Sequence, residues 1–254
     1  MKTLKWMLLA ALLLPSLALA AGKARVMTTP PIRVQVQVNA LGHVVDISPM
    51  QKLNEPFAGI VQHTLANWTF YPARINDKPV ATTTWLSIEL KAQMRDNGDA
   101  AVQVVYLGNG PDIELIPPRY PPDMVRDLRE ARIVVQATLG LDGHLSDARV
   151  VQALTTDGGR AREFVDSVMA AVSKAKGRPI VVDGQPVVSH IRCPVSFTLD
   201  RDGHPAGMPE DLKHAIDSVK YVKLEPAPEK DFSAAGDYTV ALDSPVKPLS
   251  TPGG

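Results

Sequence analysis

One short pattern occurs twice in this chain, and its spacing constrains the fold more than any other feature. Residues 34–47 align with residues 135–148 at an offset of 143 − 42 = 101 positions, and the matched pairs are Gly42 with Gly143, His43 with His144, and Asp46 with Asp147. Each segment alternates apolar and polar residues on both sides of the glycine, as two antiparallel strands joined by a tight turn would. Self-similarity at a fixed spacing indicates a duplicated structural unit. We therefore predict two copies of one hairpin.

A helical stretch follows each predicted hairpin. The apolar residues that share one helical face in the first copy are Phe57, Ile60, Val61, Leu65 and Trp68. Those in the second copy are Ala161, Phe164, Val165, Val168, Met169 and Val172. Spacings of three and four residues place side chains on the same side of a helix, where they can be buried together. We expect each helix to pack on a small sheet.

A second matched segment follows each helix, at an offset of 179 − 72 = 107 positions. The aligned pairs are Pro72 with Pro179, Asp77 with Gly184, Pro79 with Pro186, and Val80 with Val187. A β-rich strand comes next in both copies, over residues 82–92 and 187–199, and residues 101–107 could add a strand to the first sheet. The larger offset puts six extra residues (107 − 101) in the second copy, most simply around residues 155–160. Each unit is therefore predicted to be strand, strand, helix, strand.

These segments divide the chain into two small domains. The predicted parts are domain 1 at residues 31–107, a linker at 108–117, domain 2 at 118–200, and a C-terminal extension at 201–254. The extension is expected to hold a short helix at residues 209–219 and then a largely extended tail, because its many prolines prevent continuous structure. Within the tail, residues 237–242 could pair with a strand.

The first residues resemble an export signal. Lys2 and Lys5 precede an apolar run at residues 6–14, and Ala18-Leu19-Ala20 is a pattern that signal peptidases cleave. We expect cleavage after Ala20 and a soluble periplasmic protein that keeps no membrane anchor. The alternative is an uncleaved signal that anchors the chain in the inner membrane.

Composition excludes several classes of function. The charge is balanced, with 27 Lys and Arg against 27 Asp and Glu, and aromatic residues are few, which argues against a nucleic-acid groove. Cys193 is the single cysteine and alternates with apolar residues, so we expect a small buried side chain rather than a reactive thiol. No motif of a hydrolase, a metalloprotease or a phosphate-binding loop occurs. We expect no enzyme, no cofactor and no metal, and we interpret the histidines that follow Gly42, Gly143 and Gly203 as solvated turn positions.

The second copy resembles the C-terminal domain of TonB-type energy transducers. It begins Pro118-Arg119-Tyr120-Pro121, continues through a short helical stretch to Ala131 and enters the hairpin at Asp142-Gly143, like the entry of that domain. The first copy holds the other half of the signature, with Trp68-Thr-Phe70-Tyr71-Pro72 and then Asn76-Asp-Lys-Pro79-Val80. The resemblance covers residues 31–92 and 118–199. It implies an α+β fold with two tandem domains, each a small antiparallel sheet of three to four strands with a helix on one face.

Three departures from the family are visible. Ala131 and Arg132 stand where the family has a glycine before the first strand, and residues 173–177 replace an aromatic pair at the end of the second helix. The sequence also lacks a long Pro-rich spacer between the predicted signal and the first domain. Transducers use the anchor and the spacer to couple an inner-membrane motor to the outer membrane, so the resemblance implies the fold more directly than the complete role.

The resemblance implies a site for protein partners, because family members pair a receptor segment with an exposed edge strand. By this analogy the edge is the strand after the helix, residues 84–90 or 189–197. The candidate partner-binding residues are Thr84, Trp85, Leu86, Ser87, Ile88, Leu90, His190, Arg192, Val195, Phe197 and, from the entry segment, Tyr120. The simpler alternative is that these strands only close their own sheets.

Two functional hypotheses follow. The first is a periplasmic TonB-like protein-binding module, an accessory or truncated energy transducer that acts on outer-membrane receptors or other envelope proteins. The second is a general periplasmic binding or scaffold protein that has the fold without a role in energy transduction.

Overall fold

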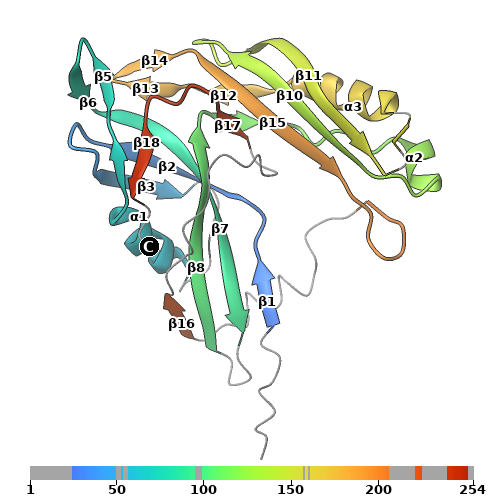
Figure 1. Ribbon diagram of the computed structural model, residues 1–254, viewed down its shortest axis with the longest axis horizontal. Coiled ribbons are helices and arrows are strands. Elements are labelled where there is room, and N and C mark those ends of the chain that lie inside the picture. Colours follow the sequence, from blue (N-terminus) through green and yellow to red (C-terminus); the bar gives the residue numbers. More distant parts are fainter. Residues whose placement is uncertain are drawn as a thin grey trace, which may run out of the picture.

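The computed structural model describes residues 25–49, 53, 57–94, 99–156, 158–159, 161–205, 221–224 and 239–250. The predicted signal peptide and the helix predicted at residues 209–219 lie outside the described residues. The first elements are β1 (Arg25–Thr28), β2 (Ile32–Val38), β3 (Val44–Pro49), α1 (Phe57–Ala66), β4 (Thr69–Tyr71), β5 (Ala73–Ile75), β6 (Lys78–Val80), β7 (Thr82–Met94), β8 (Asp99–Gly110) and β9 (Asp112–Glu114). The later ones are α2 (Pro122–Arg126), β10 (Ala131–Leu139), β11 (Leu145–Thr155), α3 (Arg162–Val172), β12 (Lys176–Arg178), β13 (Ile180–Val182), β14 (Gln185–Val187), β15 (Ser189–Phe197), β16 (Tyr221–Leu224), β17 (Val240–Ala241) and β18 (Lys247–Ser250) (Figure 1).

The first sheet is organised around the long strand β7. Strands β2 and β1 pair with one edge of β7, and β8 and β13 pair with the other. Figure 1 shows β7 and β8 extending beyond helix α1 to the region where β1 pairs with β7 and β16 pairs with β8. The predicted strand at residues 101–107 is confirmed as part of β8.

The core of the first sheet contains the predicted helical face. Phe57, Val61 and Leu65 of α1 are buried, and Trp68, just after the helix, is 1% exposed. The indole of Trp68 meets the ring of Tyr106 on β8 edge to face, with 5.6 Å between ring centroids. The helix therefore closes over β2, β7 and β8 through its apolar face.

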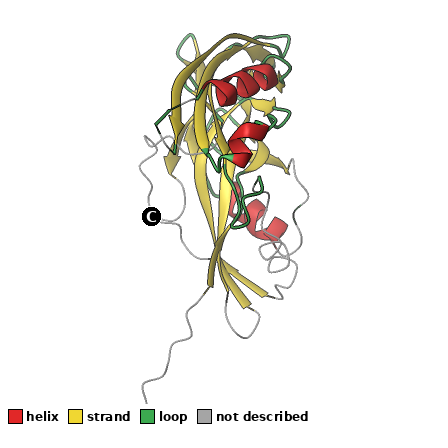
Figure 2. Ribbon diagram, turned by 90° about the vertical axis from the view of Figure 1, so that its right-hand side faces the viewer, coloured by secondary structure: helices red, strands yellow, loops and turns green. Residues whose placement is uncertain are grey.

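The second sheet has the order β11, β10, β15, β17. Helix α3 packs on it through Phe164, Val168 and Val172, which share a buried cluster with Ile133 and Val135 of β10. Figure 2 shows the helices beside the strands, viewed edge-on to the sheets. This arrangement is an antiparallel sheet with a helix on one face.

The order of elements in residues 32–94 occurs again in residues 131–197. The sequence β2, β3, α1, β4, β5, β6, β7 is followed later by β10, β11, α3, β12, β13, β14, β15. Both predicted hairpins form, because β2 pairs with β3 and β10 with β11. Gly42 and Gly143 occupy their turns with φ of 85° and 78°, a conformation that glycine adopts without steric cost.

The two sheets are connected by strand pairing. Val181 and Val182 of β13 pair with Thr83 and Thr82 of β7, so the hairpin β13–β14 extends the first sheet. A small core fills the junction, and its buried members are Ala73, Ile180, Val182 and Val246. Because the first sheet gains strands in this way it contains eight, and the prediction of three or four strands is wrong for it and correct for the four-stranded second sheet.

The chain is therefore an α+β protein, built mostly of antiparallel sheet with few helices. The pair of β16 with β8 is parallel. None of the described helices is long and apolar enough to cross a membrane.

Candidate partner-binding edge

Strand β15 lies between β10 and the short strand β17. Its whole length pairs with β10, from Ser189 opposite Leu139 to Phe197 opposite Ala131. On its other edge only Ile191 and Arg192 pair with β17, so β15 continues past β17 to Phe197. The second predicted edge strand, residues 189–197, is therefore β15, and its outer edge is the candidate site.

The main-chain groups on the outer edge come from alternate residues. The N–H of His190 donates to Asp243 Oδ1 at 2.9 Å, and the carbonyl oxygen of His190 accepts the N–H of Leu242 at 2.7 Å. Because N–H and C=O of one residue point to the same side of an antiparallel strand, Arg192 and Pro194 present their main chains to this edge as well. Pro194 has no N–H to donate.

Proline inside a strand is confined to edges and bulges, since it cannot take part in a full ladder. Pro194 is therefore a sequence signal for an edge at β15, and our sequence reasoning missed it. Because the main chain of Pro194 faces the outer edge, its missing N–H removes no hydrogen bond to β10.

The candidate side chains on β15 differ in exposure. His190 is exposed, whereas Arg192 and Val195 are half-buried. Phe197 is 4% exposed, and its ring lies 5.2 Å from Tyr120 and 4.8 Å from Phe164, centroid to centroid. His190 and Arg192 thus reach the surface of β15, whereas Val195 packs against the core cluster to which Phe197 belongs.

Tyr120 supports the domain from inside. Its hydroxyl donates to the carbonyl oxygen of Arg129 at 2.5 Å, and its ring packs against Phe164 at 5.7 Å. Partial burial raises the pKa of Tyr120, and the nearby Glu130 carboxylate raises it further. The entry segment is therefore fastened to helix α3 and β15 by this ring.

The first predicted edge is not an edge. The six candidates on β7 are all buried, and they are Thr84, Trp85, Leu86, Ser87, Ile88 and Leu90. Their strand is paired on both sides, as Leu86 shows by lying opposite Val34 of β2 and Asn109 of β8. The prediction of an exposed edge at residues 84–90 is wrong, because β8 covers the side that would have been open.

The C-terminal tail contributes residues to the β15 edge, and the sequence predicted only that part of this tail could pair with some strand. Residues 237–242 could pair with a strand by their composition, and Val240–Ala241 does so as β17, which pairs with β15. The imidazole Nδ1 of His190 also lies 2.7 Å from Asp243 Oδ2. The tail and β15 are about fifty residues apart in the chain, and no local pattern specifies their contact.

Cys193 is buried behind the same edge. Its side chain is 6% exposed, which confirms the predicted burial, and its Sγ accepts a hydrogen bond from the hydroxyl of Thr239 at 3.4 Å. Burial raises the pKa of the Cys193 thiol, and the hydrogen bond from Thr239 opposes this in part. The thiol is therefore held protonated beneath the tail.

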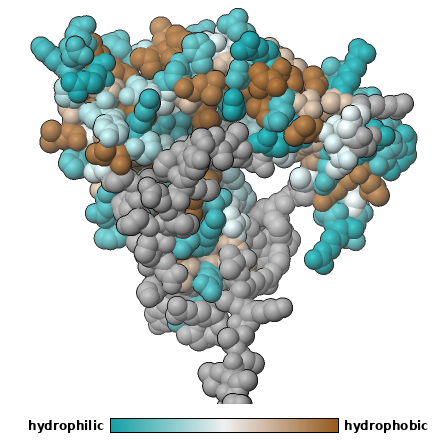
Figure 3. Space-filling view, in the orientation of Figure 1, coloured by the Kyte–Doolittle hydropathy of each residue, from teal (hydrophilic) through white to brown (hydrophobic). Residues whose placement is uncertain are grey.

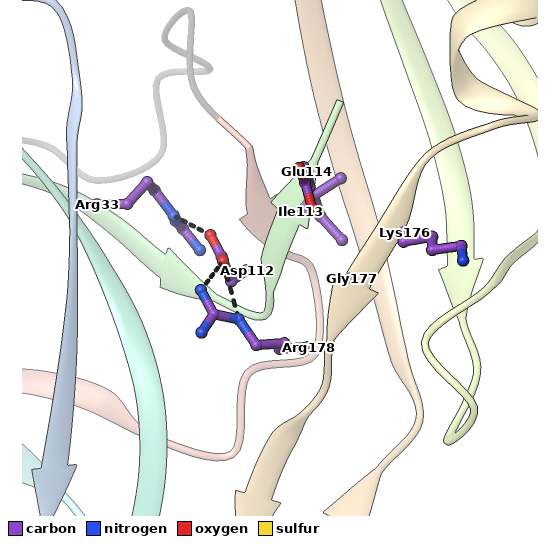
Figure 4. A pocket seen from close by; sticks show the side chains of 7 residues that line it. All are labelled: Arg33, Asp112, Ile113, Glu114, Lys176, Gly177 and Arg178. Atoms are coloured by element: carbon purple, nitrogen blue, oxygen red, sulfur yellow. Dashed lines mark hydrogen bonds and ion pairs between the residues drawn. The ribbon is translucent and has the colours of Figure 1, made fainter. Parts of the chain in front are cut away.

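A pocket of about 530 Å³ is lined by Arg33 of β2 and by residues of β9 and β12 (Figure 4). Asp112 in its wall accepts from Arg178 at 2.6 Å and lies 3.8 Å from Arg33 Nε. Burial lowers the pKa of Arg33 to about 10, while the Asp112 carboxylate acts in the opposite direction. In Figure 4 the Lys176 side chain points away from this group. Because Asp112 already pairs with two guanidinium groups, the cluster links β2, β9 and β12.

The histidines that follow turn glycines are exposed, and they are His43, His144 and His204. Hydrogen bonds from the main-chain N–H groups of His144 and His204 lower the pKa of Asp142 and Asp200, respectively. Within the part of the chain that the structure describes, no group of three potential metal ligands gathers. On the face shown in Figure 3, polar and apolar residues alternate over the described surface rather than forming one apolar area.

Comparison with known protein families gives a match for one part of the chain. The family described as Gram-negative bacterial TonB protein C-terminal matches residues 116–199. A search of curated proteins gave no match. The family is a protein-interaction domain of the Gram-negative cell envelope rather than an enzyme. The matched residues contain the entry segment with Tyr120, helix α3 and strands β10 to β15. Residues 116–199 therefore form a TonB C-terminal domain.

Proposed function

We propose that this chain is a periplasmic protein-binding module that pairs an extended segment of an envelope protein with the outer edge of β15. The observation that carries the proposal is the position of β15 in a TonB C-terminal domain, with one edge fully paired to β10 and the other contacted, among the described residues, from His190 to Cys193. Main-chain groups on such an edge can extend the sheet by one strand, which gives affinity independent of most side chains.

Three side chains add specificity to this edge. His190, Arg192 and Val195 lie where a paired segment would contact them. Phe197 and Tyr120 act indirectly, because they fix the position of β15 and the entry segment. The residues of β7 take no part in binding in this proposal.

The complete arrangement is two tandem TonB-C-like domains, at residues 31–107 and 118–200. The recurring element order in residues 32–94 and 131–197 supports this division. We infer that the strand after the helix keeps an outer edge in the second domain and not in the first, because β8 and β13 pair with the corresponding side of β7. The first domain then serves as a platform that holds the second.

Outer-membrane receptors are the partners that the family favours. On this proposal the chain is exported with cleavage after Ala20 and acts as an accessory or truncated energy transducer. The alternative is a general scaffold protein of the periplasm, and the partial cover of the β15 edge by β17 favours it.

A peptide titration tests the binding mode. The full chain is titrated with a peptide from the periplasmic N-terminal segment of an outer-membrane receptor of the same cell, and then with the same peptide methylated at alternate main-chain nitrogens. Strand addition predicts binding of the first and loss of binding to the second, since methylation removes N–H donors and leaves the side chains unchanged. Equal binding of both peptides would contradict pairing at an edge.

Two variants at position 192 distinguish the contribution of the main chain to binding from that of the side chain. Arg192→Pro removes one N–H from the outer edge without altering pairing to β10, as Pro194 already does in the native strand, and Arg192→Ala removes only the side chain. The proline variant should bind the receptor peptide at least about tenfold more weakly than the alanine variant, the ratio that about 1.4 kcal/mol produces. Equal affinities would place the site elsewhere.

An uptake measurement separates the two functions. Deleting the gene should reduce siderophore or vitamin uptake under starvation if the chain serves receptors. Normal uptake in a strain without a second transducer would leave the scaffold function.

A further inference from the structure

The C-terminal strap, our name for residues 239–250, begins with residues 239–243, which lie on the edge of β15. Val240 lies opposite Arg192 and Ala241 opposite Ile191 in an antiparallel pair. The N–H of Leu242 donates to the carbonyl oxygen of His190 at 2.7 Å, so the pairing continues one residue further. The strap thus makes the same kind of contact that an incoming strand would make.

Side chains fix the strap in this register. The Asp243 carboxylate accepts the main-chain N–H of His190 at 2.9 Å and lies 2.7 Å from its imidazole. At the other end, the Thr239 hydroxyl donates to Cys193 Sγ at 3.4 Å, and Arg33 donates to the carbonyl oxygen of Thr239 at 3.4 Å. Among the described residues, these contacts hold both ends of residues 239–243 on the edge.

The strap also fits closely against the first sheet. A Cβ on Gly110, at the end of β8, would lie 2.7 Å from the main-chain nitrogen of Ala241 and 3.4 Å from its Cβ. Real Cβ atoms do not approach main-chain nitrogen so closely, so glycine at position 110 allows the main chain of the strap to lie this near to the end of β8.

Beyond β17 the strap is anchored to the first repeat of elements. Val246 is 1% exposed in the junction core, and its carbonyl oxygen accepts from the buried amide of Asn109 at 3.1 Å. Strand β18 pairs with β4, where Lys247 lies opposite Tyr71. Because residues 244–250 are held independently of β15, β17 remains close to the edge even when it is displaced.

We propose that the C-terminal strap is an internal competitor that closes the β15 edge, and that the partner is an extended peptide with the chemistry of the strap. This rests on the proposed function, and it specifies both the regulation and the partner class of the same site. The partner strand runs antiparallel to β15 and places a carboxylate at His190. It displaces β17 when it binds.

The strap sets the threshold for binding. A segment tethered in the same chain has an effective concentration in the millimolar range, so a free peptide of identical sequence competes poorly with it. A cellular partner binds when its segment pairs over a longer stretch, and β15 offers this because it extends to Phe197, beyond the residues that β17 covers. Pairing over those residues first gives a route to displacement of β17 without complete unfolding.

A single substitution locks the strap. Thr239→Cys places a second sulfur where the Thr239 hydroxyl now contacts Cys193 Sγ, and the protein contains one cysteine, so oxidation of the full chain has one intramolecular product. The expected result is loss of both free thiols on oxidation. Persistence of two free thiols in the oxidised monomer would overturn the position of the strap.

The probe is a fluorescent synthetic peptide of residues 237–244, titrated into the full chain. The locked form should show no binding, the reduced form weak binding, and Asp243→Ala, which removes the carboxylate that accepts the N–H of His190, at least tenfold tighter binding than the native chain. Equal binding by the locked and reduced forms, or no binding to any form, would overturn the proposal.

Thiol labelling gives a second readout that does not require the peptide. Asp243→Ala should increase the labelling rate of Cys193 at least fivefold, because it releases the strap that shields the thiol. Asp142→Ala is the matched control, since Asp142 also accepts the N–H of a histidine, His144, at 3.1 Å and lies 3.3 Å from its imidazole, but in a local turn. Equal labelling of Cys193 in the two variants would overturn the proposal.

The receptor peptide separates this inference from the proposed function. If it binds the locked and reduced forms equally, the strap does not regulate binding and the inference fails while the function stands. If the strap peptide behaves as expected and the receptor peptide fails to bind even Asp243→Ala, the exchange at the edge stands and the receptor function fails.

Discussion

The main-chain N–H of Phe70 donates to the carbonyl oxygen of Gly42 at 2.8 Å, which fastens the hairpin between β2 and β3 to the strand that follows helix α1. The same contact joins Gly177 to Gly143 in the second sheet, also at 2.8 Å. In each case the turn lies so close that a Cβ on the glycine would meet a carbonyl oxygen, at 2.0 Å for Gly42 and 2.5 Å for Gly143. The recurring glycines therefore hold the hairpin against the helix-to-strand connection.

This contact predicts a large effect of one methyl group. Gly42→Ala should lower the free energy of unfolding by about 2–5 kcal/mol, the sum of left-handed strain and overpacking against Phe70. Gly184→Ala is the matched control, because Gly184 has a similar φ of 77° and nothing within 4 Å of its Cβ position, so only about 1–2 kcal/mol of strain applies. Urea unfolding of both variants measures the difference. Equal losses would mean that the turn does not depend on its contact with Phe70.

We expect the side chain of Trp68 to contribute strongly to the stability of the first core. Trp68→Ala removes a side chain that is 1% exposed and packs on Tyr106, and it should cost about 3–5 kcal/mol in the free energy of unfolding. Leu41→Ala, at a turn position that is 79% exposed, should change stability by less than about 0.5 kcal/mol. A cost near zero for Trp68→Ala in chemical denaturation would show that the helical face is not closed by the indole.

We expect the ion pair between Asp112 and Arg33 to stabilise the fold. Asp112→Ala leaves Arg33 without its carboxylate partner, although Arg33 still donates to Ser87 Oγ at 2.6 Å. Because both side chains are only partly screened by water, with 18% and 16% exposed, the cost should be about 1–3 kcal/mol. Arg178→Ala should cost less, since its side chain is 54% exposed. A double-mutant cycle of Arg33 and Asp112, measured by thermal unfolding, tests the pair directly, and additive losses would show that it contributes no coupling.

We expect the buried thiol of Cys193 to make the folded protein less stable at alkaline pH. Folding raises the pKa of its thiol by burial, so the folded state holds the proton more tightly than the unfolded state. Stability is then complete below the ordinary pKa of a thiol and falls as pH rises through and beyond it. The thermal midpoint of the native chain should fall more between pH 7 and about pH 10 than that of Cys193→Ala. Parallel pH profiles for the two proteins would contradict this linkage.

Local patterns predicted much of the secondary structure. The alternation around Gly42 and Gly143 predicted both hairpins, and the spacing of Phe164, Val168 and Val172 predicted the buried face of α3. These features are decided by residues close together in the chain, because side-chain periodicity and turn conformation depend on near neighbours. The burial of Cys193 followed from the same alternation.

Strand neighbours were harder to predict. Nothing in residues 84–90 distinguishes a central strand from an edge, and only the fold shows that β8 and β13 pair with β7 on its second side. Main-chain donors and acceptors are the same in every residue, so a strand's side chains specify which face is buried but hardly which strand lies beside it. Pro194 is the exception, because a missing N–H is visible in the sequence.

The sequence by itself determined the repeated hairpin-helix-strand order and the resemblance of residues 118–199 to a TonB C-terminal domain. The tertiary structure alone decided that β15 rather than β7 has an edge, and that Thr239, Val240 and Asp243 lie on it. The physical reason is distance along the chain: a contact between Cys193 and Thr239 depends on the closed cores that bring β15 and the strap together.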